Sequence, residues 1–411
     1  MNLAGFAGTR AVGFVNEYVA GPVGQIFLRL LFMVVIPLVF ASVTLGIAGL
    51  GDLRRVGRVG VKTLLYFLAT TLVAATVGIT LMNFVRPGAG FSAETREELM
   101  ATFSTEAAQR QEQAALGFGV DTFVNMIPKN PIDAAARTDL LGVLVFSIFL
   151  GIALTLVPPE RAKPFLGLLD TLGHAMVKII DMVMAFAPIG VAGLIFVVTS
   201  KFGGKILGQL AAYVVLVLAA LAFQLFVVLS VAVRIAGGLS PVRFFSKIRG
   251  VLVTAFSTSS SNATLPTSIA TAEQSLKIPS SVAGFVLPLG ATMNMNGTSL
   301  FEGMTVLFLA QVFGLGLTLA QQIQVVVLCV IMAVGAAGVP GGSIPLVMII
   351  LEQVGLPGGS IAVILGVDRI LDMARTVPNV TGDLTAACFV ARSEKLWNPD
   401  LVRGGPEAIR P

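Results

Sequence analysis

The chain has 411 residues, of which 55% are hydrophobic and only 12% are charged. A soluble domain carries roughly 25% charged residues, so much of the surface of this protein must face something other than water. The net charge of +5 does not indicate nucleic-acid binding, because the lysines and arginines collect beside apolar runs.

Five apolar runs approach or exceed the ~20 residues that an α-helix needs to cross a membrane. They cover 24–50, 62–85, 140–157, 177–200 and 207–236. We therefore expect an all-α membrane protein, a multi-span helical bundle surrounded by the lipid bilayer. Cys329, Cys388 and His174 lack the spacing of metal ligands, and we expect them to be ordinary helix residues.

Basic residues mark alternate links between these runs. They follow the first, third and fifth runs and recur in the C-terminal tail, as at Arg54, Arg161, Arg234 and Lys395. These regions should be cytoplasmic, and the acidic segment 87–139 should lie outside. The first run would then begin outside the cell with no signal peptide before it. Either the chain inserts with its N-terminus outside, or an upstream span is absent from this sequence, and we favour the second interpretation.

Two polar or glycine-rich clusters interrupt apolar sequence after residue 250. One is the Ser/Thr run 257–261 within 250–275, and the other is 335–343 within 318–356. Irregular backbone at membrane depth survives only where it is buried in protein or lines a cavity, and paired broken segments mark transporter binding sites. We expect two re-entrant helical hairpins. The alternative, two loops outside the membrane, does not account for the lack of charged residues in both clusters.

The segment 277–312 is interrupted in a similar way at 290–298. Thr292, Asn294, Asn296 and Thr298 supply side-chain oxygens there. Oxygen ligands without sulfur or imidazole suit a hard cation such as Na⁺. A helix kink alone would explain Gly297, but it would not explain four amides and hydroxyls in an apolar segment.

The last apolar segment, 361–391, contains polar residues at steps of three and four. These are Asp368, Asp372, Arg375, Thr376, Asn379 and Asp383. At this spacing they form one stripe of a helix, and each ionisable group costs at least ~2.5 kcal/mol at membrane depth. An ion pair between Asp372 and Arg375 would explain only two of them. A binding site explains all: a guanidinium for a carboxylate, a carboxylate for an ammonium, and a deeper carboxylate and amide for a cation.

The chain resembles the glutamate/aspartate transporter family of dicarboxylate and amino acid:cation symporters from about residue 28 to residue 392. The motifs SSSNATLP, GATMNMNGT, AAGVPGG and DRILDMARTVPNVTGD carry the resemblance, at 259–266, 290–298, 336–342 and 368–383. The resemblance implies a homotrimer in the inner (plasma) membrane of the cell. Each protomer would have a scaffold and an elevator-type transport domain.

On that template the chain divides into segments with distinct roles. They are an N-terminal scaffold span (1–61, with the first span of the family apparently missing), a transport-domain span and extracellular loop (62–139), scaffold spans (140–206), a transport-domain span (207–249), an inner re-entrant hairpin (250–275), a broken span with the cation motif (277–312), an outer gate hairpin (318–356), a substrate-binding span (361–392) and a cytoplasmic tail (393–411).

The resemblance also implies a substrate pocket and cation sites. The substrate residues would be Ser260, Ser261, Thr298, Gly338, Val339, Asp372, Arg375, Thr376 and Asn379. Arg375 would hold the side-chain carboxylate and Asp372 the amino group. A first sodium site would use Gly290, Asn294, Asn379 and Asp383. A second would use Met295 and the carbonyls of Thr292, Ala333, Val334 and Ala336. A third would use Phe67, Thr70, Thr71, Asn294 and Asn296.

The sequence departs from the family pattern near these sites. Asn296 replaces an acidic residue, which puts the third sodium site in doubt. Glu302 stands where some relatives carry a proton-accepting glutamate; the alternative is a glutamate near a solvated helix end. Relatives often carry an arginine at the position of Ser259 or Met373, and Arg369 is a candidate to replace it here.

These observations predict a secondary active symporter that imports aspartate or glutamate with sodium, and they leave open whether protons contribute. The alternative is a proton-driven, largely sodium-independent symporter for an acidic amino acid or a C4-dicarboxylate. We expect Na⁺ and no organic cofactor. An enzyme would need a nucleophile and base or metal ligands in spacing, and a channel would need a repeated filter, and the sequence shows neither.

Overall fold

The structure is a computed structural model that describes residues 10–90, 127–137, 140–202, 205–336 and 338–402. Within these ranges the chain forms helices and no strand, which confirms the all-α prediction. Most of the acidic segment 87–139, the two ends of the chain and Ala337 lie outside the described residues. The expected loop and tail therefore stay predictions.

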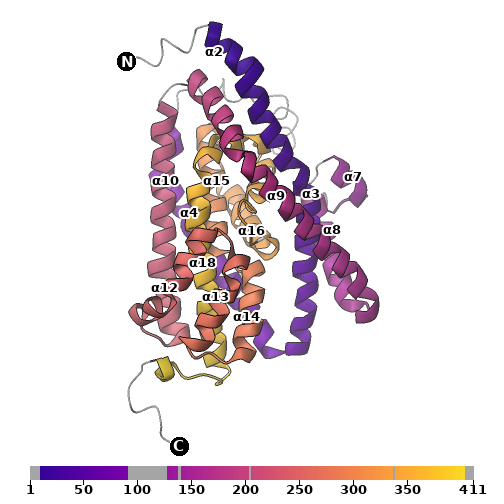
Figure 1. Ribbon diagram of the computed structural model, residues 1–411, viewed down its shortest axis with the longest axis vertical. Coiled ribbons are helices and arrows are strands. Elements are labelled where there is room, and N and C mark those ends of the chain that lie inside the picture. The colour runs from indigo at the N-terminus through magenta and orange to yellow at the C-terminus, as the bar shows by residue number, and fades with distance from the viewer. Residues whose placement is uncertain (1–9, 91–126, 138–139, 203–204, 337, 403–411) are drawn as a thin grey trace, which may run out of the picture.

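The helix α3 (Gly21–Val56) packs against α8 (Leu140–Leu156) and α9 (Pro159–Phe202), and α9 runs diagonally across the molecule in Figure 1. The short α2 (Arg10–Val15) and the π-helical η1 (Asn16–Ala20) precede α3 without a break, and α7 (Pro131–Ala136) precedes α8. Asn16 and Ser200 exchange hydrogen bonds between η1 and α9. Except for α7, which falls in the expected extracellular loop, these helices cover the segments expected to form the scaffold, and that role stays a prediction.

The remaining helices gather around α15 (Asn296–Val312), in which every residue except Gln311 is buried. Four long helices lie around it: α4 (Arg58–Val85), α10 (Lys205–Phe223), α14 (Ser280–Met293) and α18 (Leu365–Ser393). The helix α10 is extended by η3 (Gln224–Val228), α11 (Leu229–Ala232) and η4 (Val233–Gly237). Two helix pairs complete the group, α12 (Pro241–Thr258) with α13 (Ser261–Gln274) and α16 (Leu319–Gly335) with α17 (Ile344–Gln353). The short helices η2 (Pro87–Gly90), η5 (Gly358–Val363) and η6 (Pro399–Val402) complete the described chain.

Several helices are long and apolar enough to cross a membrane. Among the described residues these are Val12–Ala48, Arg58–Gly90 and Gly208–Gly237, with the bent pair Pro159–Val183 and Ala185–Leu194 as a fourth. The bend of 57° falls at residue 184. Pro188 is four residues further on and has no N–H to donate to the carbonyl of residue 184, which explains the position of the bend.

Other apolar helices among the described residues are shorter. For example, α17 has 10 residues and is about 15 Å long, half of a hydrocarbon core of about 30 Å. Ser259–Ser261 at the tip of α12–α13 are at most 6% exposed, and the described residues at the tip of α16–α17 are buried or half-buried, which argues against two solvated loops.

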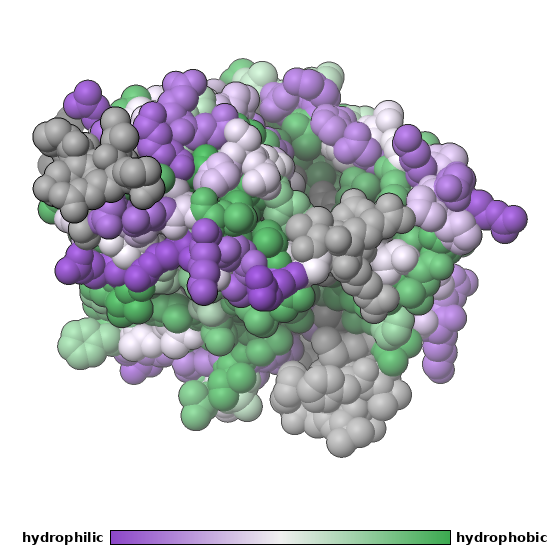
Figure 2. Space-filling model, turned by 90° about the horizontal axis from the view of Figure 1, so that it is seen from below, coloured by the Kyte–Doolittle hydropathy of each residue, from purple (hydrophilic) through white to green (hydrophobic). Residues whose placement is uncertain are grey.

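One end of the molecule is polar. Figure 2 shows this end, where hydrophilic side chains form a band with hydrophobic side chains around and behind it. Arg58 and Lys62 of α4 lie here, 2.8 and 2.6 Å from the carboxylate of Glu394, which follows α18. These cations lower the pKa of Glu394, chiefly through the hydrogen bond from Arg58. The ion pairs join the start of α4 to the end of α18.

Candidate functional site

The polar stripe predicted on the last helix lies in the protein interior. All six of its residues are at most 4% exposed. The list is Asp368, Asp372, Arg375, Thr376, Asn379 and Asp383. Because α18 packs against α12, α13, α14 and α15, each of these side chains meets a protein neighbour rather than lipid or bulk water.

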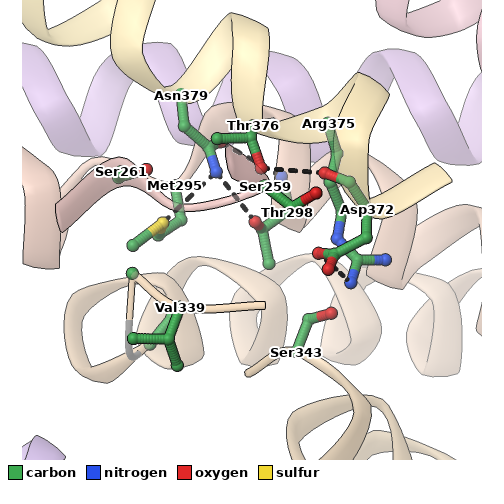
Figure 3. A pocket seen from close by; sticks show the side chains of 12 residues that line it. Ser259, Ser261, Met295, Thr298, Val339, Ser343, Asp372, Arg375, Thr376 and Asn379 are labelled. Atoms are coloured by element: carbon green, nitrogen blue, oxygen red, sulfur yellow. Dashed lines mark hydrogen bonds and ion pairs between the residues drawn. The ribbon is translucent and has the colours of Figure 1, made fainter. Parts of the chain in front are cut away.

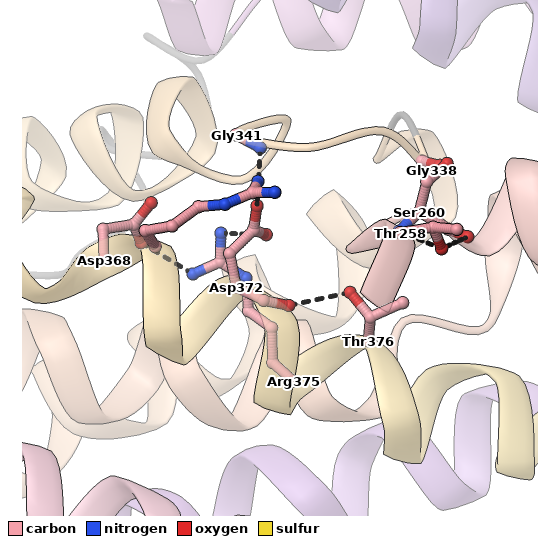
Figure 4. A network of polar contacts seen from close by, with 9 residues as sticks. Thr258, Ser260, Gly338, Gly341, Asp368, Asp372, Arg375 and Thr376 are labelled. Carbon is pink, nitrogen blue, oxygen red and sulfur yellow. Dashed lines mark hydrogen bonds and ion pairs between the residues drawn. The ribbon is translucent and has the colours of Figure 1, made fainter. Parts of the chain in front are cut away.

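Arg375 is bonded to two carboxylates of its own helix. Its Nη1 donates to Asp368 Oδ1 at 2.8 Å and its Nη2 to Asp372 Oδ1 at 2.7 Å (Figure 4). The guanidinium also lies over the ring of Phe301, 4.2 Å from its centroid. The role of Asp368 was missed in the sequence, although its spacing of seven from Arg375 places both on one face, two turns apart. Removing one partner of such a buried pair is strongly destabilising, so the three groups act as a unit.

Asp372 has further partners beyond Arg375. Its Oδ2 accepts, at 3.0 Å, the backbone N–H of Gly341, which lies in the link between α16 and α17, the expected outer hairpin. The guanidinium of Arg369, which is half exposed, lies 3.8 Å from the same oxygen. The structure thus places the guanidinium of Arg369 beside Asp372, and its role in place of a pocket arginine stays a prediction. Asp372 links the last helix to the tip of the outer hairpin.

Asn379 joins α18 to the break between α14 and α15. Its Oδ1 accepts the N–H groups of Gly297 at 2.7 Å and Thr298 at 3.3 Å, so it caps the first turn of α15. Its Nδ2 donates to Thr298 Oγ1 at 3.0 Å and contacts Met295 Sδ at 3.3 Å. A Cβ at Gly297 would collide with the carbonyl of Arg375, so the close approach of the two helices requires glycine there.

The tips of the two hairpins touch. Ser260 Oγ donates to the carbonyl of Gly338 at 2.6 Å, and the N–H of Asn262 donates to the same carbonyl at 3.1 Å. Ser260 also accepts the N–H of Ala263 at 3.1 Å and so caps α13. The tips of the α12–α13 pair and the α16–α17 pair, the expected inner and outer hairpins, therefore close over the polar stripe on α18.

A cavity of about 20 Å³ lies between the tips and α18 (Figure 3). It is lined by Ser259, Ser261, Met295, Thr298, Ala336, Gly338, Val339, Ser343, Asp372, Arg375, Thr376 and Asn379. Every residue predicted to bind substrate, except Ser260, is in this set. Ser259 and Ser343 also line the cavity, although no binding role was expected for them from the sequence. For Ser343 the available signal was its position directly after the glycines of the outer tip.

The residues of the first predicted cation site lie around Asp383. Asn294 Nδ2 donates to Asp383 Oδ1 at 2.9 Å, and a Cβ at Gly290 would collide with the Asp383 carboxylate. Asn379 is instead bonded to Met295, Thr298 and the start of α15. Carboxylate and carbonyl oxygens fit a hard cation such as Na⁺.

The second predicted cation site lies at two helix C-termini. Ala333 and Val334 are in the last turn of α16, and Thr292 is in the last turn of α14. Carbonyls at a helix C-terminus have no intrahelical partner and lie at the negative end of the dipole, which fits a cation. Met295 and Ala336 line the adjacent cavity. The Thr292 side chain is exposed and donates to the Leu289 carbonyl, so only its backbone oxygen is available.

The third predicted group also comes together. Thr71 Oγ1 donates to Asn296 Oδ1 at 3.0 Å, and Thr70 Oγ1 lies 3.4 Å from Asn294 Oδ1 and 3.2 Å from the Phe67 carbonyl. Asn296 Nδ2 is buried and has no partner in the described chain. A carboxylate would offer a second oxygen where Asn296 offers an amide N–H₂ group. These residues therefore fit a cation poorly.

Glu302 is fully buried on α15. Neither carboxylate oxygen has a hydrogen-bond partner among the described residues. This excludes the alternative of a glutamate at a solvated helix end. An ionised carboxylate without hydrogen bonds is costly in such an interior.

The chain matches a family model and several known proteins over most of its length. The model of the sodium:dicarboxylate symporter family matches residues 3–393. The proton/sodium-glutamate symport protein of Bacillus subtilis (strain 168) is 37% identical over 378 residues, which cover 92% of this chain and 87% of that protein. The proton/glutamate-aspartate symporter of Escherichia coli (strain K12) is 36% identical, with 91% and 85% covered. The C4-dicarboxylate transport protein of Anaeromyxobacter sp. (strain K) is 36% identical, with 94% and 86% covered.

Proposed function

Because the chain belongs to the sodium:dicarboxylate symporter family, we propose that it is a secondary active symporter that imports aspartate or glutamate together with sodium. The observation that carries this proposal is the pairing of Asp372 and Arg375 in a closed cavity between two hairpin tips. The family consists of transporters, so the chain is not an enzyme. Its bacterial relatives support a place in the plasma membrane.

The cavity offers opposite charges to the two ends of an acidic amino acid. Arg375 has a planar fork of donors that suits the side-chain carboxylate, and Asp372 suits the ammonium group. The N-termini of α13 and α17 lie at the same cavity and favour negative charge. A plain dicarboxylate has no ammonium group, so Asp372 favours an amino acid over it.

Substrate entry requires the hairpin tips to separate. The cavity of about 20 Å³ holds about one water molecule, far less than an amino acid. The contacts between the tips are the bonds that Ser260 and Asn262 donate to the Gly338 carbonyl. Opening the outer tip also breaks the bond from Gly341 to Asp372 and so frees this carboxylate for the substrate.

The division into two helix groups supports an elevator-type movement. The first group, α3, α8 and α9, would be the scaffold, and the helices around α15 would be the transport domain. The two groups meet where α16 packs on α3, and Gly46 lies so close to the Val334 carbonyl that a Cβ would collide with it. Gly57, with a φ of 67°, is the single residue that connects the end of α3 to the start of α4. We further propose that three copies of the chain form a homotrimer whose protomers contact one another through the scaffold helices.

Uptake into proteoliposomes tests the coupling ion. With an inward sodium gradient and equal pH on both sides, the protein should accumulate labelled L-aspartate or L-glutamate. A pH gradient without sodium should give little uptake. Failure to accumulate either amino acid under both gradients would contradict the proposed function.

Proton-driven uptake is the second candidate, because Asn296 weakens one cation site and Glu302 is buried without a hydrogen-bond partner. On this alternative, a pH gradient alone drives uptake, and Glu302→Gln abolishes that uptake while leaving substrate binding intact. Sodium-driven uptake that is unchanged in Glu302→Gln would exclude it.

A further inference from the structure

A groove lies outside the candidate site, where the chain leaves the last helix. It is open, has a volume of about 440 Å³ and lies at the polar end of the molecule, just before the C-terminal tail (Figure 1). Its lining includes two cations, Arg392 and Lys395, and two leucines that are about half exposed, Leu396 and Leu401. A surface that combines basic and apolar side chains is typical of the zone where lipid headgroups meet acyl chains.

Lys395 holds a backbone conformation that favours glycine. Its φ is 58°, and its N–H donates to the Arg392 carbonyl while the Leu396 N–H donates to the Ala391 carbonyl. This pair of bonds ends a helix with a turn in which glycine usually occupies the position of Lys395. The amino group of Lys395 is bonded to none of the residues that the structure describes. Strain of this kind persists where the surrounding structure enforces it, often at ligand sites.

A second lysine repeats this conformation beside the groove. Lys277, just after α13, has a φ of 57° and an exposed side chain. The indole N–H of Trp397, which lines the groove, donates to the carbonyl of Leu276 at 2.9 Å and so brings Lys277 next to the groove. Of the four non-glycine residues with a positive φ in the described chain, two are therefore lysines at this one groove.

The acidic side chains of this segment do not neutralise the groove. Glu394 is paired with Arg58 and Lys62 of α4, and Asp400 is not part of the lining. The guanidinium of Arg392 is held in place because its Nη1 donates to two carbonyls of η4, at 3.0 and 3.1 Å. The other nitrogens of this guanidinium keep donors for a ligand. The groove therefore attracts an anion.

We propose that this groove binds the phosphate of an anionic phospholipid headgroup. Arg392 and Lys395 hold the phosphate, and Lys277 adds a third cation beside it. Leu396 and Leu401 contact the adjoining part of an acyl chain. A soluble anion or an acidic peptide would use the cations but would leave the two leucines exposed to water.

The expected topology agrees with a lipid ligand. The basic links between the spans predict that this end of the molecule faces the cytoplasm, and the cytoplasmic leaflet carries the anionic lipids. Basic pockets beside spanning helices on that side recognise such headgroups. A lipid bound between Lys277 and Lys395 joins the end of α13 to the end of α18.

Thermal unfolding of the full chain in detergent tests the inference. Dioctanoyl phosphatidylglycerol is titrated as the anionic lipid and dioctanoyl phosphatidylcholine as the zwitterionic one. A ligand that binds only the folded protein raises the unfolding temperature, so the titration gives an apparent dissociation constant. Phosphatidylglycerol should stabilise the wild type at concentrations at which phosphatidylcholine does not.

Lys395→Gly and Lys277→Gly each remove one cation and relieve the left-handed strain. Their unfolding temperatures without lipid should therefore stay the same or rise. Each variant should bind phosphatidylglycerol about fivefold more weakly, and the double variant about 25-fold, as expected for basic residues at an anionic lipid surface. Arg86→Gly is the matched control, because Arg86 also has a positive φ, of 52°. It follows α4, a helix about 42 Å long that begins at the polar end, and its loss should leave the affinity unchanged.

Four results would overturn the inference. An equal shift with phosphatidylcholine would show a general effect of lipid. An equal shift with inorganic phosphate or poly-L-glutamate would assign the groove to a soluble anion or an acidic partner. Wild-type affinity in the double variant, or an equal loss in Arg86→Gly, would show that the two lysines do not bind the headgroup. No transported substrate enters these measurements, so their outcome is independent of the proposed function.

Discussion

The guanidinium of Arg375 lies 2.7 Å from the carboxylate of Asp372, although the two groups are proposed to hold opposite charges of the substrate. In the closed cavity they neutralise each other, with Asp368 as the second partner of Arg375. This arrangement keeps a buried cation and a buried anion satisfied when no substrate is between them. It also means that substitutions here affect folding as well as binding, which shapes the choice of variants.

Arg375→Lys should abolish high-affinity binding of acidic amino acids. Lysine keeps the charge, but it has no planar fork and cannot bond Asp368, Asp372 and a carboxylate in the same geometry. We expect binding of L-aspartate to weaken by at least about 2 kcal/mol, or about 30-fold, measured by calorimetry. Arg234→Lys, at an exposed side chain far along the chain from the stripe, is the control and should change the affinity little. Wild-type affinity in Arg375→Lys would contradict the pocket assignment.

Asp372→Asn should change which substrates are accepted. The amide keeps an oxygen for the N–H of Gly341 but loses the charge for an ammonium group. Losing one partner of a buried charge pair costs about 2–5 kcal/mol, so L-aspartate binding should fall by that amount. Succinate has no ammonium group and should lose less. Competition between the two ligands measures the ratio, and an equal loss for both would argue against contact between Asp372 and the amino group.

Asn296→Asp should add a cation site. The new carboxylate would stand beside Thr71 and Asn294, with oxygens in place of the unpaired amide N–H₂ group. We expect a steeper sodium dependence of substrate binding, with the Hill coefficient higher by about one than in the wild type. Asn296→Ala removes the amide without adding charge and should not steepen the dependence. The same steepness in the wild type and Asn296→Asp would show that the carboxylate binds no sodium.

Glu394→Gln should remove a pH-dependent contribution to stability at the polar end. Arg58 and Lys62 lower the pKa of Glu394 in the folded protein, so this contribution is present above the ordinary glutamate pKa of about 4.3. It is lost as the pH falls through the lowered value. Thermal unfolding of wild type and variant between pH 7 and pH 3 measures the difference, which should be largest near neutral pH and vanish at the acid end. A difference independent of pH would assign the effect to packing.

Local periodicity made much of the site predictable from the sequence. The stripe on 361–391 was visible because residues three and four apart share a helix face, and the structure buries all six of them. The breaks in 250–275 and 318–356 were visible because polar and glycine-rich clusters interrupt apolar sequence. Both are local signals, and the hairpins and the broken span follow from them.

Partner choice was not predictable in this way. From the sequence, an ion pair between Asp372 and Arg375 was the alternative to a binding site; the structure contains this pair and gives Arg375 a second carboxylate in Asp368. It suggested that Asn379 and Asp383 act together, but Asn379 caps α15 while Asp383 accepts from Asn294. Several polar side chains on one helix face can bond the same neighbours. Which of them forms each hydrogen bond depends on how α14, α15 and α18 pack.

The sequence by itself determined that this is a helical membrane protein with a polar stripe and two broken hairpins, because burial in lipid and helical periodicity leave marks in every short segment. Only the tertiary structure decided that Ser260 bonds Gly338 across the tips, and that Glu302 and the Ser343 hydroxyl find no hydrogen-bond partner among the residues that the structure describes. Those facts depend on distances between residues far apart in the chain, which only the packing of the helices sets.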